Sequence, residues 1–255
     1  MNIVTSANHA FFHCLSGLAE SVRKHYNKPL IVYDVGLTEE DRSKLDAHII
    51  QIDVDSNCFD FATDGDSRFI KTTHKPACIK HYFKNFTEKM IFVDADCLFM
   101  ERVEESGFDV GVTLRTGKGL DLTDHFNGVL NAGVLFFNTS ADELVDRWAE
   151  ECRKENTTDQ KALTDILSET IDWKHYNHIY DWHGLKIKVF KTDDYNDYHL
   201  KTGKIFHFKG LMHEKGIYEQ LLAANHAGKD MYKTYKRLRR KRKASWWQQL
   251  FQKWR

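Results

Sequence analysis

Short apolar runs rich in β-branched residues alternate with helical patterns over the first hundred residues of the chain. Between the first two runs, apolar residues recur at helical spacing from Phe11 to Val22. Alternation at this period predicts right-handed βαβ units, and therefore a mainly parallel sheet with helices on both faces. The four runs are Asn2–Ser6, Leu30–Val35, His48–Val54 and Met90–Asp96.

The α/β pattern continues to about residue 225. Thr38 is a good N-cap residue followed by acids, and Pro76 stands at the first position of a helix predicted over Lys75–Phe86. No internal repeat interrupts the pattern, so we expect one α/β domain at residues 1–225 and a distinct tail at residues 226–255. Further strands are predicted at Asp109–Arg115, Leu130–Asn138, Leu185–Phe190 and Lys204–Phe208, and helices at Asp142–Arg153 and Thr158–Leu167.

A chain of 255 residues with 42% hydrophobic residues can bury one substantial core. No apolar run approaches the ~18 residues that cross a bilayer, and the N-terminus lacks the basic flank and apolar core of a signal peptide. We therefore expect a cytoplasmic protein that is neither secreted nor membrane-spanning. The cysteines lack paired spacing, which predicts reduced packing residues rather than disulfides or a zinc site; they are Cys14, Cys58, Cys78, Cys97 and Cys152.

The formal net charge of zero hides a strong asymmetry along the chain. Residues 229–255 contain 11 Lys or Arg and one acid, Asp230, which gives a net charge of +10. Because the whole chain is neutral, the remaining residues carry a net charge of −10. An acidic body with a basic tail predicts a polyanionic partner for the tail.

Two aspartates, Asp94 and Asp96, stand one residue apart at the end of an apolar strand in "MIFVDADCLFM". Ligands bind at the carboxyl ends of strands in open α/β sheets. Two carboxylates there can share one divalent cation, because Mg²⁺ and Mn²⁺ prefer oxygen ligands. Taken alone, the same pair also fits a turn cap beside a solvated aspartate.

Three later segments follow this Asp-x-Asp motif: "NAGVLFFN" at residues 131–138, "TDQKAL" at 158–163 and "IFHFKG" at 205–210. Together with "NIVTSANHAFFHCLSGLAESV" at the N-terminus, they resemble the GT-A fold glycosyltransferases of retaining family 8 over roughly residues 1–215. The resemblance implies the α/β GT-A fold, a mainly parallel Rossmann-like sheet with a small added antiparallel sheet. In this chain a basic and aromatic amphipathic helix is expected to follow it.

By this resemblance, Asp94, Asp96 and His207 are the ligands of a Mn²⁺ or Mg²⁺ ion. Such a cation stabilises the charge that develops on the diphosphate of a departing nucleotide. His207 also fits a core histidine between Phe206 and Phe208, and its place in "HFKG" favours the metal ligand. The implied donor is a UDP-sugar.

The resemblance also implies a set of contacts with the nucleotide sugar. Lys75 precedes a helix N-terminus, which is a natural anion site, although a solvated surface lysine is the alternative. Phe11 fits an aromatic stack on the nucleotide and a helix core equally well. The expected contacts are Thr5, Ala7, Asn8, Phe11, Lys75, Ala95, Gly210, His213 and Lys215.

The segment after Gly210 departs from the family. Where the family commonly has a phosphate-binding lysine, this chain has His213, with Lys215 two residues later, and the usual Pro-Trp is missing. The third phosphate contact is therefore open between Lys209, His213 and Lys215.

Asn131, Asp159 and Gln160 are the residues that the resemblance places around the transferred sugar. Asp159 can bind sugar hydroxyls, and Gln160 can stabilise an oxocarbenium-like centre. Glutamine is a poor nucleophile, which favours front-face displacement over a covalent intermediate. Asp159 also suits the start of a helix after Thr158, and both roles can hold together.

Seven basic residues within Lys236–Lys243 precede an aromatic segment in which Trp246, Leu250 and Trp254 recur at helical spacing. A cationic cluster before an amphipathic aromatic helix favours an anchor on an anionic membrane. Packing on the domain or on a partner subunit is an alternative, as is nucleic acid, which is disfavoured because a phosphate backbone mainly needs charge. The expected membrane residues are Arg239, Arg240, Lys241, Arg242, Lys243, Trp246, Trp247, Phe251 and Trp254.

These motifs predict a metal-dependent glycosyltransferase that moves a hexose from a UDP-sugar to a glycan or lipid-linked saccharide, with retention, in lipopolysaccharide or capsule biosynthesis. An inverting GT-A transferase or a sugar nucleotidyltransferase could use the same aspartates. An inverting enzyme needs a carboxylate base, for which Asp121, Asp124 and Asp181 are available. A non-catalytic nucleotide or nucleic-acid binder acting through its tail has no need of the whole motif set. The sequence leaves the sugar, the acceptor and the oligomeric state open.

Overall fold

The computed structural model describes residues 1–53, 73–115, 128–154, 157–173, 175–208 and 216–240. The predicted residues that lie outside these ranges are Cys58, Asp121, Asp124, Lys209, Gly210, His213, Lys215, Lys241, Arg242, Lys243, Trp246, Trp247, Phe251 and Trp254.

An eight-stranded sheet in the order β3-β2-β1-β4-β7-β6-β9-β8 forms the centre of the fold. Strands β3, β2, β1 and β4 are parallel to one another, and β6 is parallel to β9. The antiparallel pairs are β4 with β7, β6 with β7 and β8 with β9. The strands are β1 (Asn2–Ala7), β2 (Leu30–Asp34), β3 (Ala47–Gln51), β4 (Met90–Val93), β6 (Val110–Leu114), β7 (Leu130–Phe137), β8 (His178–Trp182) and β9 (Leu185–Phe190).

These strand directions gather several chain segments at one edge of the sheet. The carboxyl ends of β1, β2, β4, β6 and β9 lie at the same edge, and β7 begins there because it runs in the opposite direction. The residues that follow β4 are therefore close to the first residues of β7. This edge is where ligands bind in α/β sheets.

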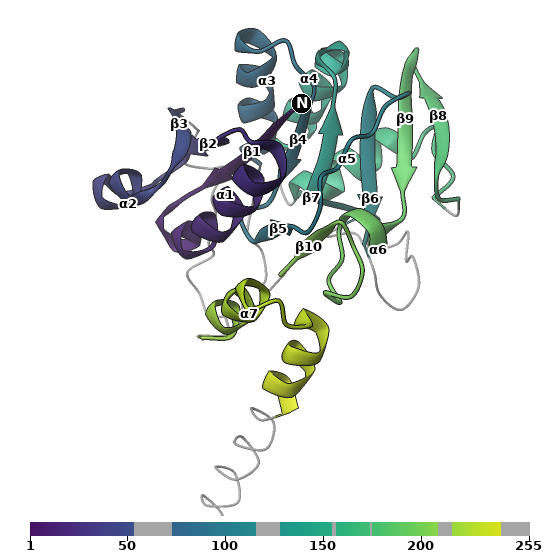
Figure 1. Ribbon diagram of the computed structural model, residues 1–255. Helices are drawn as coiled ribbons and strands as arrows, with labels where there is room; N and C mark the ends of the chain where they lie inside the picture. Colours follow the sequence, from purple (N-terminus) through teal and green to yellow (C-terminus); the bar gives the residue numbers. More distant parts are fainter. Residues whose placement is uncertain (54–72, 116–127, 155–156, 174, 209–215, 241–255) are drawn as a thin grey trace, which may run out of the picture.

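Helices cover both faces of the sheet (Figure 1). Apolar residues of α3, α4 and α5 pack with the strands in one buried cluster that contains Trp148. Helix α1 packs on the other face through Leu15, Leu18 and Val22. The helices are α1 (Phe12–Tyr26), α2 (Glu39–Lys44), α3 (Lys75–Asn85), α4 (Asp142–Glu151) and α5 (Asp159–Leu167), with short 3₁₀ turns at His9–Phe11 and Thr139–Ala141.

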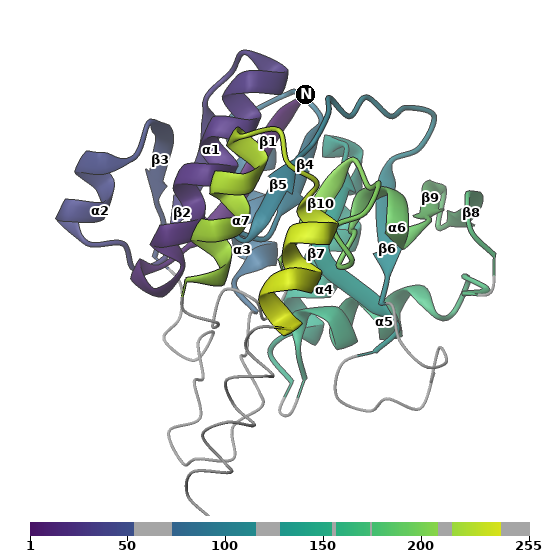
Figure 2. The same ribbon diagram turned by 60° about the horizontal axis from the view of Figure 1, so that its bottom comes forward.

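A small antiparallel sheet joins β5 (Cys97–Phe99) to β10 (Ile205–His207). Helix α7 (Ile217–His226) and the helical residues 231–240 pack against this sheet, and α7 lies along α1 (Figure 2). Gly17 allows this approach, because a Cβ there would lie 2.8 Å from the Tyr218 hydroxyl. Met231 is buried in the same cluster, so apolar packing continues past residue 225, where the predicted domain ends.

The structure confirms the predicted α/β fold class, a large and mostly parallel sheet with a small added antiparallel sheet. Thr38 caps α2 with its side chain, and Pro76 lies in the first turn of α3, as expected. Cys14, Cys78, Cys97 and Cys152 are buried in the core. Among the described residues, none of the helices combines the length and the apolar character that crossing a bilayer requires.

Candidate active site

Asp94 and Asp96 lie on a tight turn between β4 and β5. The Cys97 N–H donates to the Asp94 carbonyl at 3.0 Å and closes the turn. The Asp94 N–H donates to the Gly133 carbonyl of β7 at 2.9 Å. The apolar run thus ends as a strand at Val93, and both carboxylates emerge where the chain reverses direction.

His207 reaches the turn because β10 pairs with β5, which places His207 opposite Cys97. Its Nε2 atom lies 3.3 Å from Asp96 Oδ1 and 3.7 Å from Asp94 Oδ2. Burial alone would raise the pKa of Asp96, but the His207 ring in its protonated form, through its charge and then through a hydrogen bond, holds that pKa below its ordinary value. The three predicted metal ligands therefore lie together.

The residues fit a divalent cation. His207 Nε2 lies within 3.7 Å of a carboxylate oxygen of each aspartate, and hard cations accept oxygen donors of this kind. Cys97 is also within reach of Asp96 and His207. Burial, followed by the nearby aspartates, raises the pKa of the Cys97 thiol, and its Sγ donates to the Gly133 carbonyl at 3.6 Å. A thiol that keeps its proton is a poor ligand, so the carboxylate oxygens and the imidazole nitrogen suit a hard cation better than Cys97 does.

Gly133 of β7 packs directly beneath the His207 ring. A Cβ at this position would lie 2.4 Å from His207 Cε1 and 2.7 Å from Asn131 Oδ1. Any side chain larger than hydrogen must therefore push the imidazole or the Asn131 amide out of place.

We expect Gly133→Ala to weaken Mn²⁺ binding, because the added methyl group displaces the His207 ring from the two aspartates. Overpacking of this kind costs about 1–3 kcal/mol of stability as well. Gly111→Ala is the matched control, because its Cβ would meet Phe190 at 2.6 Å in the apolar core. Both variants should lower the unfolding free energy, and titration with Mn²⁺ should show weaker binding for Gly133→Ala alone. Equal Mn²⁺ affinities in the two variants would refute this reading of Gly133.

Lys75 is almost completely buried between two aspartates, with 4% of its surface exposed. Its Nζ lies 2.8 Å from Asp94 Oδ1 and 2.9 Å from Asp159 Oδ2, and donates to the Ala132 carbonyl at 3.0 Å. Although burial by itself lowers the pKa of Lys75, the carboxylates of Asp159 and Asp94 raise it well above the ordinary value. Lys75 thus links the metal-site turn to α5, and a diphosphate contact would require it to give up one of these partners.

The residues predicted to surround the sugar lie beside this lysine. Asp159 begins α5 and is 2% exposed, while Asn131 is the second residue of β7, which is buried along its whole length. Gln160 Oε1 accepts from the Ala132 N–H at 3.3 Å, which ties α5 to β7. The structure therefore brings Asn131, Asp159 and Gln160 together next to Asp94.

Asn196, which the sequence does not single out, also belongs to the site. It follows the short helix α6 (Thr192–Tyr195) and is completely buried. Its side chain contacts His207 Nδ1 at 2.7 Å and Asn131 Oδ1 at 2.9 Å. The surrounding stretch, "KTDDYNDY", is polar and carries no motif that could have identified this residue.

The predicted nucleotide contacts near the N-terminus lie around the end of β1. Ala7 and Ala95 are buried, and Phe11 is half-buried against the α1 side of the core. Thr5 lies within β1 and is completely buried. Asn8 Oδ1 accepts from the Ala10 N–H and caps a short 3₁₀ turn. These contacts stay predictions.

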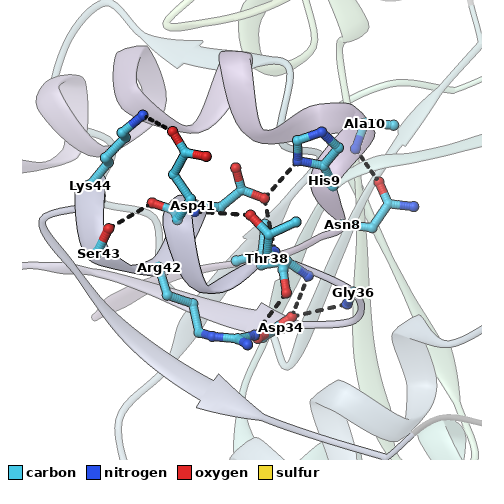
Figure 3. A network of polar contacts seen from close by, with 12 residues as sticks. Asn8, His9, Ala10, Asp34, Gly36, Thr38, Asp41, Arg42, Ser43 and Lys44 are labelled. Carbon is cyan, nitrogen blue, oxygen red and sulfur yellow. Dashed lines mark hydrogen bonds and ion pairs between the residues drawn. The ribbon is translucent and has the colours of Figure 1, made fainter.

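Asp34, at the carboxyl end of β2, anchors the neighbouring loop (Figure 3). Its Oδ1 accepts from the N–H groups of Gly36 and Leu37, and its Oδ2 pairs with Arg42. The same corner holds His9 through a 2.8 Å contact between its Nδ1 and the Asp41 carboxylate. Both oxygens of Asp34 are used inside the protein, so this aspartate shapes the corner.

His74, the residue before α3, is buried and its Nε2 lies 2.7 Å from Ser6 Oγ. Burial, and secondarily the charge of Lys75, lowers the pKa of His74 to about 4 from 6.5. Between these two values the unfolded chain binds a proton that the folded chain does not, so acid favours unfolding.

We expect the unfolding free energy to fall by roughly 3 kcal/mol from His74 as the pH drops from about 6.5 to about 4. His74→Gln has no titrating group and should lose this part of the pH dependence while it keeps a partner for Ser6. Urea unfolding of both proteins at a series of pH values measures the difference. The same slope in both would show that His74 does not carry it.

Asp181, one of the three carboxylates available as an inverting base, lies in β8 opposite Lys186 of β9. Lys186 is near the amino end of β9, and the Asp94 turn is at the carboxyl edge of the sheet. Asp181 therefore lies at the edge of the sheet opposite to the site. Its distance from the turn argues against a role as the acceptor base.

No family model matches the chain, and none of the curated proteins does. Solved structures do match. An active-site mutant of LgtC, a family 8 GT-A enzyme, gives a TM-score of 0.51 at 16% identity over 81% of this chain and 86% of that one. A glycosyltransferase involved in glycosylation of the major capsid of PBCV-1 gives a TM-score of 0.53 at 12% identity, covering 84% and 96%.

This structural similarity shows that the chain has the fold of a glycosyltransferase. Both of these neighbours are glycosyltransferases, and the site lies at the sheet edge where α/β folds bind their ligands. The chain therefore has the GT-A fold that its motifs predict, and its resemblance to family 8 is supported. At 12% and 16% identity the likeness establishes the fold.

Proposed function

We propose that this chain is a metal-dependent glycosyltransferase that transfers a hexose from a UDP-sugar to a saccharide or lipid-linked saccharide, with retention of configuration. One observation carries the proposal. Asp94, Asp96 and His207, from distant parts of the sequence, converge at the carboxyl edge of the sheet beside the Lys75–Asp159 pair. The similarity to solved glycosyltransferases supports the same reading.

The metal site would use Asp94 Oδ2, Asp96 Oδ1 and His207 Nε2. A Mn²⁺ or Mg²⁺ ion bound there supplies positive charge to the diphosphate leaving group. Lys75 holds the other oxygen of Asp94 at 2.8 Å, which fixes the orientation of that carboxylate. The protein thereby prepares the site before the donor binds.

The sugar would lie against Asn131, Asp159 and Gln160. Asn131 Oδ1 already accepts two hydrogen bonds inside the protein, so its Nδ2 is the group that can donate to a sugar hydroxyl. Gln160 Oε1 is held by the Ala132 N–H and keeps a second lone pair that can face an electron-poor anomeric carbon. An amide oxygen stabilises positive charge and is a poor nucleophile, which favours front-face displacement with retention.

A panel of nucleotide sugars incubated with Mn²⁺ tests this proposal through slow hydrolysis of the donor. We expect one UDP-sugar to be hydrolysed only when metal is present, and ¹H NMR at early times should show the released sugar with the anomeric configuration of the donor. Inverted product would refute retention alone. If no nucleotide sugar is bound or hydrolysed with or without metal, the proposed activity is wrong.

We further propose that the basic C-terminal segment binds anionic membrane surfaces. In the helical residues 231–240, Met231 and Thr234 are buried, while the opposite face carries exposed cations. Lys233 pairs with Asp230, but the face as a whole carries an excess of positive charge, which suits a polyanionic surface. The exposed cations are Lys233, Lys236, Arg237, Arg239 and Arg240.

A chain truncated after Arg240 should bind anionic vesicles at least about 100-fold more weakly, because it loses Lys241, Arg242 and Lys243, each worth about 1 kcal/mol at such a surface. Donor hydrolysis should persist, because the packing of Met231 and Leu238 is kept. Vesicle sedimentation with anionic and neutral lipids measures the difference. Vesicle binding unchanged by the truncation would contradict a membrane role for the removed residues.

A further inference from the structure

The Asn196 side-chain amide makes three hydrogen bonds at the centre of the site. Its Oδ1 lies 2.7 Å from His207 Nδ1, and its Nδ2 donates to Asn131 Oδ1 at 2.9 Å and to Thr113 Oγ1 at 2.7 Å. The Asn196 N–H also donates to the Thr192 carbonyl at 2.8 Å, which fixes the backbone. One amide thus joins the proposed metal ligand to the proposed sugar-binding residue.

Neighbouring groups that can act only as hydrogen-bond donors determine the orientation of the Asn196 amide. The Gly133 backbone N–H can only donate, and it lies 2.7 Å from the Asn131 side chain, so the atom it meets is Oδ1. An oxygen at that position requires a donor from Asn196, which is Nδ2. Thr113 gives its own hydroxyl proton to the Asn131 carbonyl at 3.3 Å and can therefore accept from the same Nδ2.

With Nδ2 assigned, Asn196 Oδ1 faces His207, and an amide oxygen can only accept. His207 Nδ1 must therefore carry a proton. In the neutral ring, Nε2 then keeps its lone pair, and this atom is the one that faces Asp96 at 3.3 Å and Asp94 at 3.7 Å. A lone pair aimed at two carboxylates suits a cation between them.

We propose that Asn196 is a positioning residue that holds His207 in the Nδ1–H tautomer, with Nε2 facing the two aspartates, and orients Asn131 through the same amide. The functional meaning of this arrangement rests on the proposed metal-dependent transfer. The tautomer itself is a property of the metal-free protein. Partners that orient a metal-binding histidine in this way typically change metal affinity by about 10–100-fold when they are removed.

The direct test is the ¹⁵N NMR spectrum of the His207 ring in the metal-free protein, assigned with His207→Gln. The spectrum is recorded at about pH 8.5, where an ordinary imidazole with a pKa of about 6.5 is neutral. We expect the proton on Nδ1 in the wild-type protein. A proton on Nε2 with Nδ1 bare would overturn the proposal without any variant.

Three variants separate the contact of Asn196 Oδ1 with His207 from the contact of Asn196 Nδ2 with Asn131. Asn196→Leu removes both contacts. It should abolish the tautomer preference of His207 and weaken Mn²⁺ binding by about 10–100-fold. The EPR signal of free Mn²⁺ measures the binding. Asn196→Asp keeps an acceptor for His207 Nδ1 and loses the donor to Asn131. Asn196→Asp should therefore keep the Nδ1–H tautomer of His207, whereas the NMR signals of the Asn131 side-chain amide should shift relative to the wild-type protein. Thr113→Val removes a partner on the far side of Asn196 and should leave the His207 tautomer unchanged.

The outcomes distinguish this inference from the proposed function. If wild-type protein binds Mn²⁺ and Asn196→Leu keeps both the tautomer and the affinity, the inference about Asn196 is wrong and the metal site stands. If the wild-type ring shows the Nδ1–H tautomer and loses it in Asn196→Leu, but no protein binds Mn²⁺, the positioning role is supported and the metal-dependent function fails. A thermal melt of each variant confirms that it is folded.

Discussion

Lys75→Met is expected to lower the unfolding free energy by about 3–5 kcal/mol, because removing one partner of a buried ion pair leaves charge without compensation. Lys75 stands between Asp94 and Asp159, and Asp159 is only 2% exposed. Urea unfolding at neutral pH measures the loss. Lys80→Met, in the same helix, is the matched control: Lys80 pairs with Asp146 at the surface, and such pairs contribute about 0–1 kcal/mol.

The double variant Lys75→Met with Asp159→Leu separates stability from activity. Replacing both partners of a buried pair by apolar groups is often nearly neutral, so most of the lost stability should return. Donor hydrolysis should stay low, because Asp159 is also a proposed sugar-binding residue. Stability losses that simply add in the double variant would show that Lys75 and Asp159 do not act as a pair.

Asp96→Asn is expected to reduce Mn²⁺-dependent donor hydrolysis by at least about 10³-fold, because a catalytic cation supplies several kcal/mol of charge stabilisation and about 1.4 kcal/mol is tenfold in rate. The amide is nearly the same size as the carboxylate, so the fold should survive. Asp109→Asn is a suitable control, since Asp109 precedes β6 at the opposite edge of the sheet and bonds with Ser140 and the Lys186 N–H.

Hydrolysis rates and Mn²⁺ binding should be measured for both aspartate variants. Asp109→Asn should cost stability and leave both quantities unchanged. Mn²⁺ affinity that is equal in Asp96→Asn and wild type would remove Asp96 from the metal site. A rate loss of similar size in Asp109→Asn would show that the effect is not specific to the site.

Much of the fold was predictable because its signals are local. Strand β4 is a continuous apolar run, and α2 and α5 each follow a threonine, Thr38 and Thr158, whose side chain caps the helix. The predicted strand around Met90 was too long by three residues, because the chain turns at Asp94. The apolar pattern does not reveal this turn, because backbone hydrogen bonds close it.

The elements that were not predicted depend on distant partners. β5 has three residues, too few for any periodicity, and it exists because it pairs with β10, a strand that was predicted at Lys204–Phe208 and spans Ile205–His207. β8 is mostly exposed at the sheet edge and therefore shows no apolar alternation. Short or exposed strands of this kind are recognised only once their neighbours are in place.

The site was predictable only where a motif marked it. Asp94, Asp96, His207 and Asn131 were expected together, and the structure brings them together. The burial of Lys75 between two carboxylates was not expected, because it depends on the convergence of α3, β4 and α5. Roles for the residues after Phe208, including His213 and Lys215, stay predictions.

The most direct measurement is a crystal structure of the wild-type protein with Mn²⁺ and UDP, with the metal located by its anomalous scattering. We predict one Mn²⁺ site between Asp94, Asp96 and His207 Nε2, with the UDP diphosphate bound to the same ion at the carboxyl edge of the sheet. A Mn²⁺ ion located elsewhere, or UDP bound away from the Asp94 turn, would contradict the proposed active site.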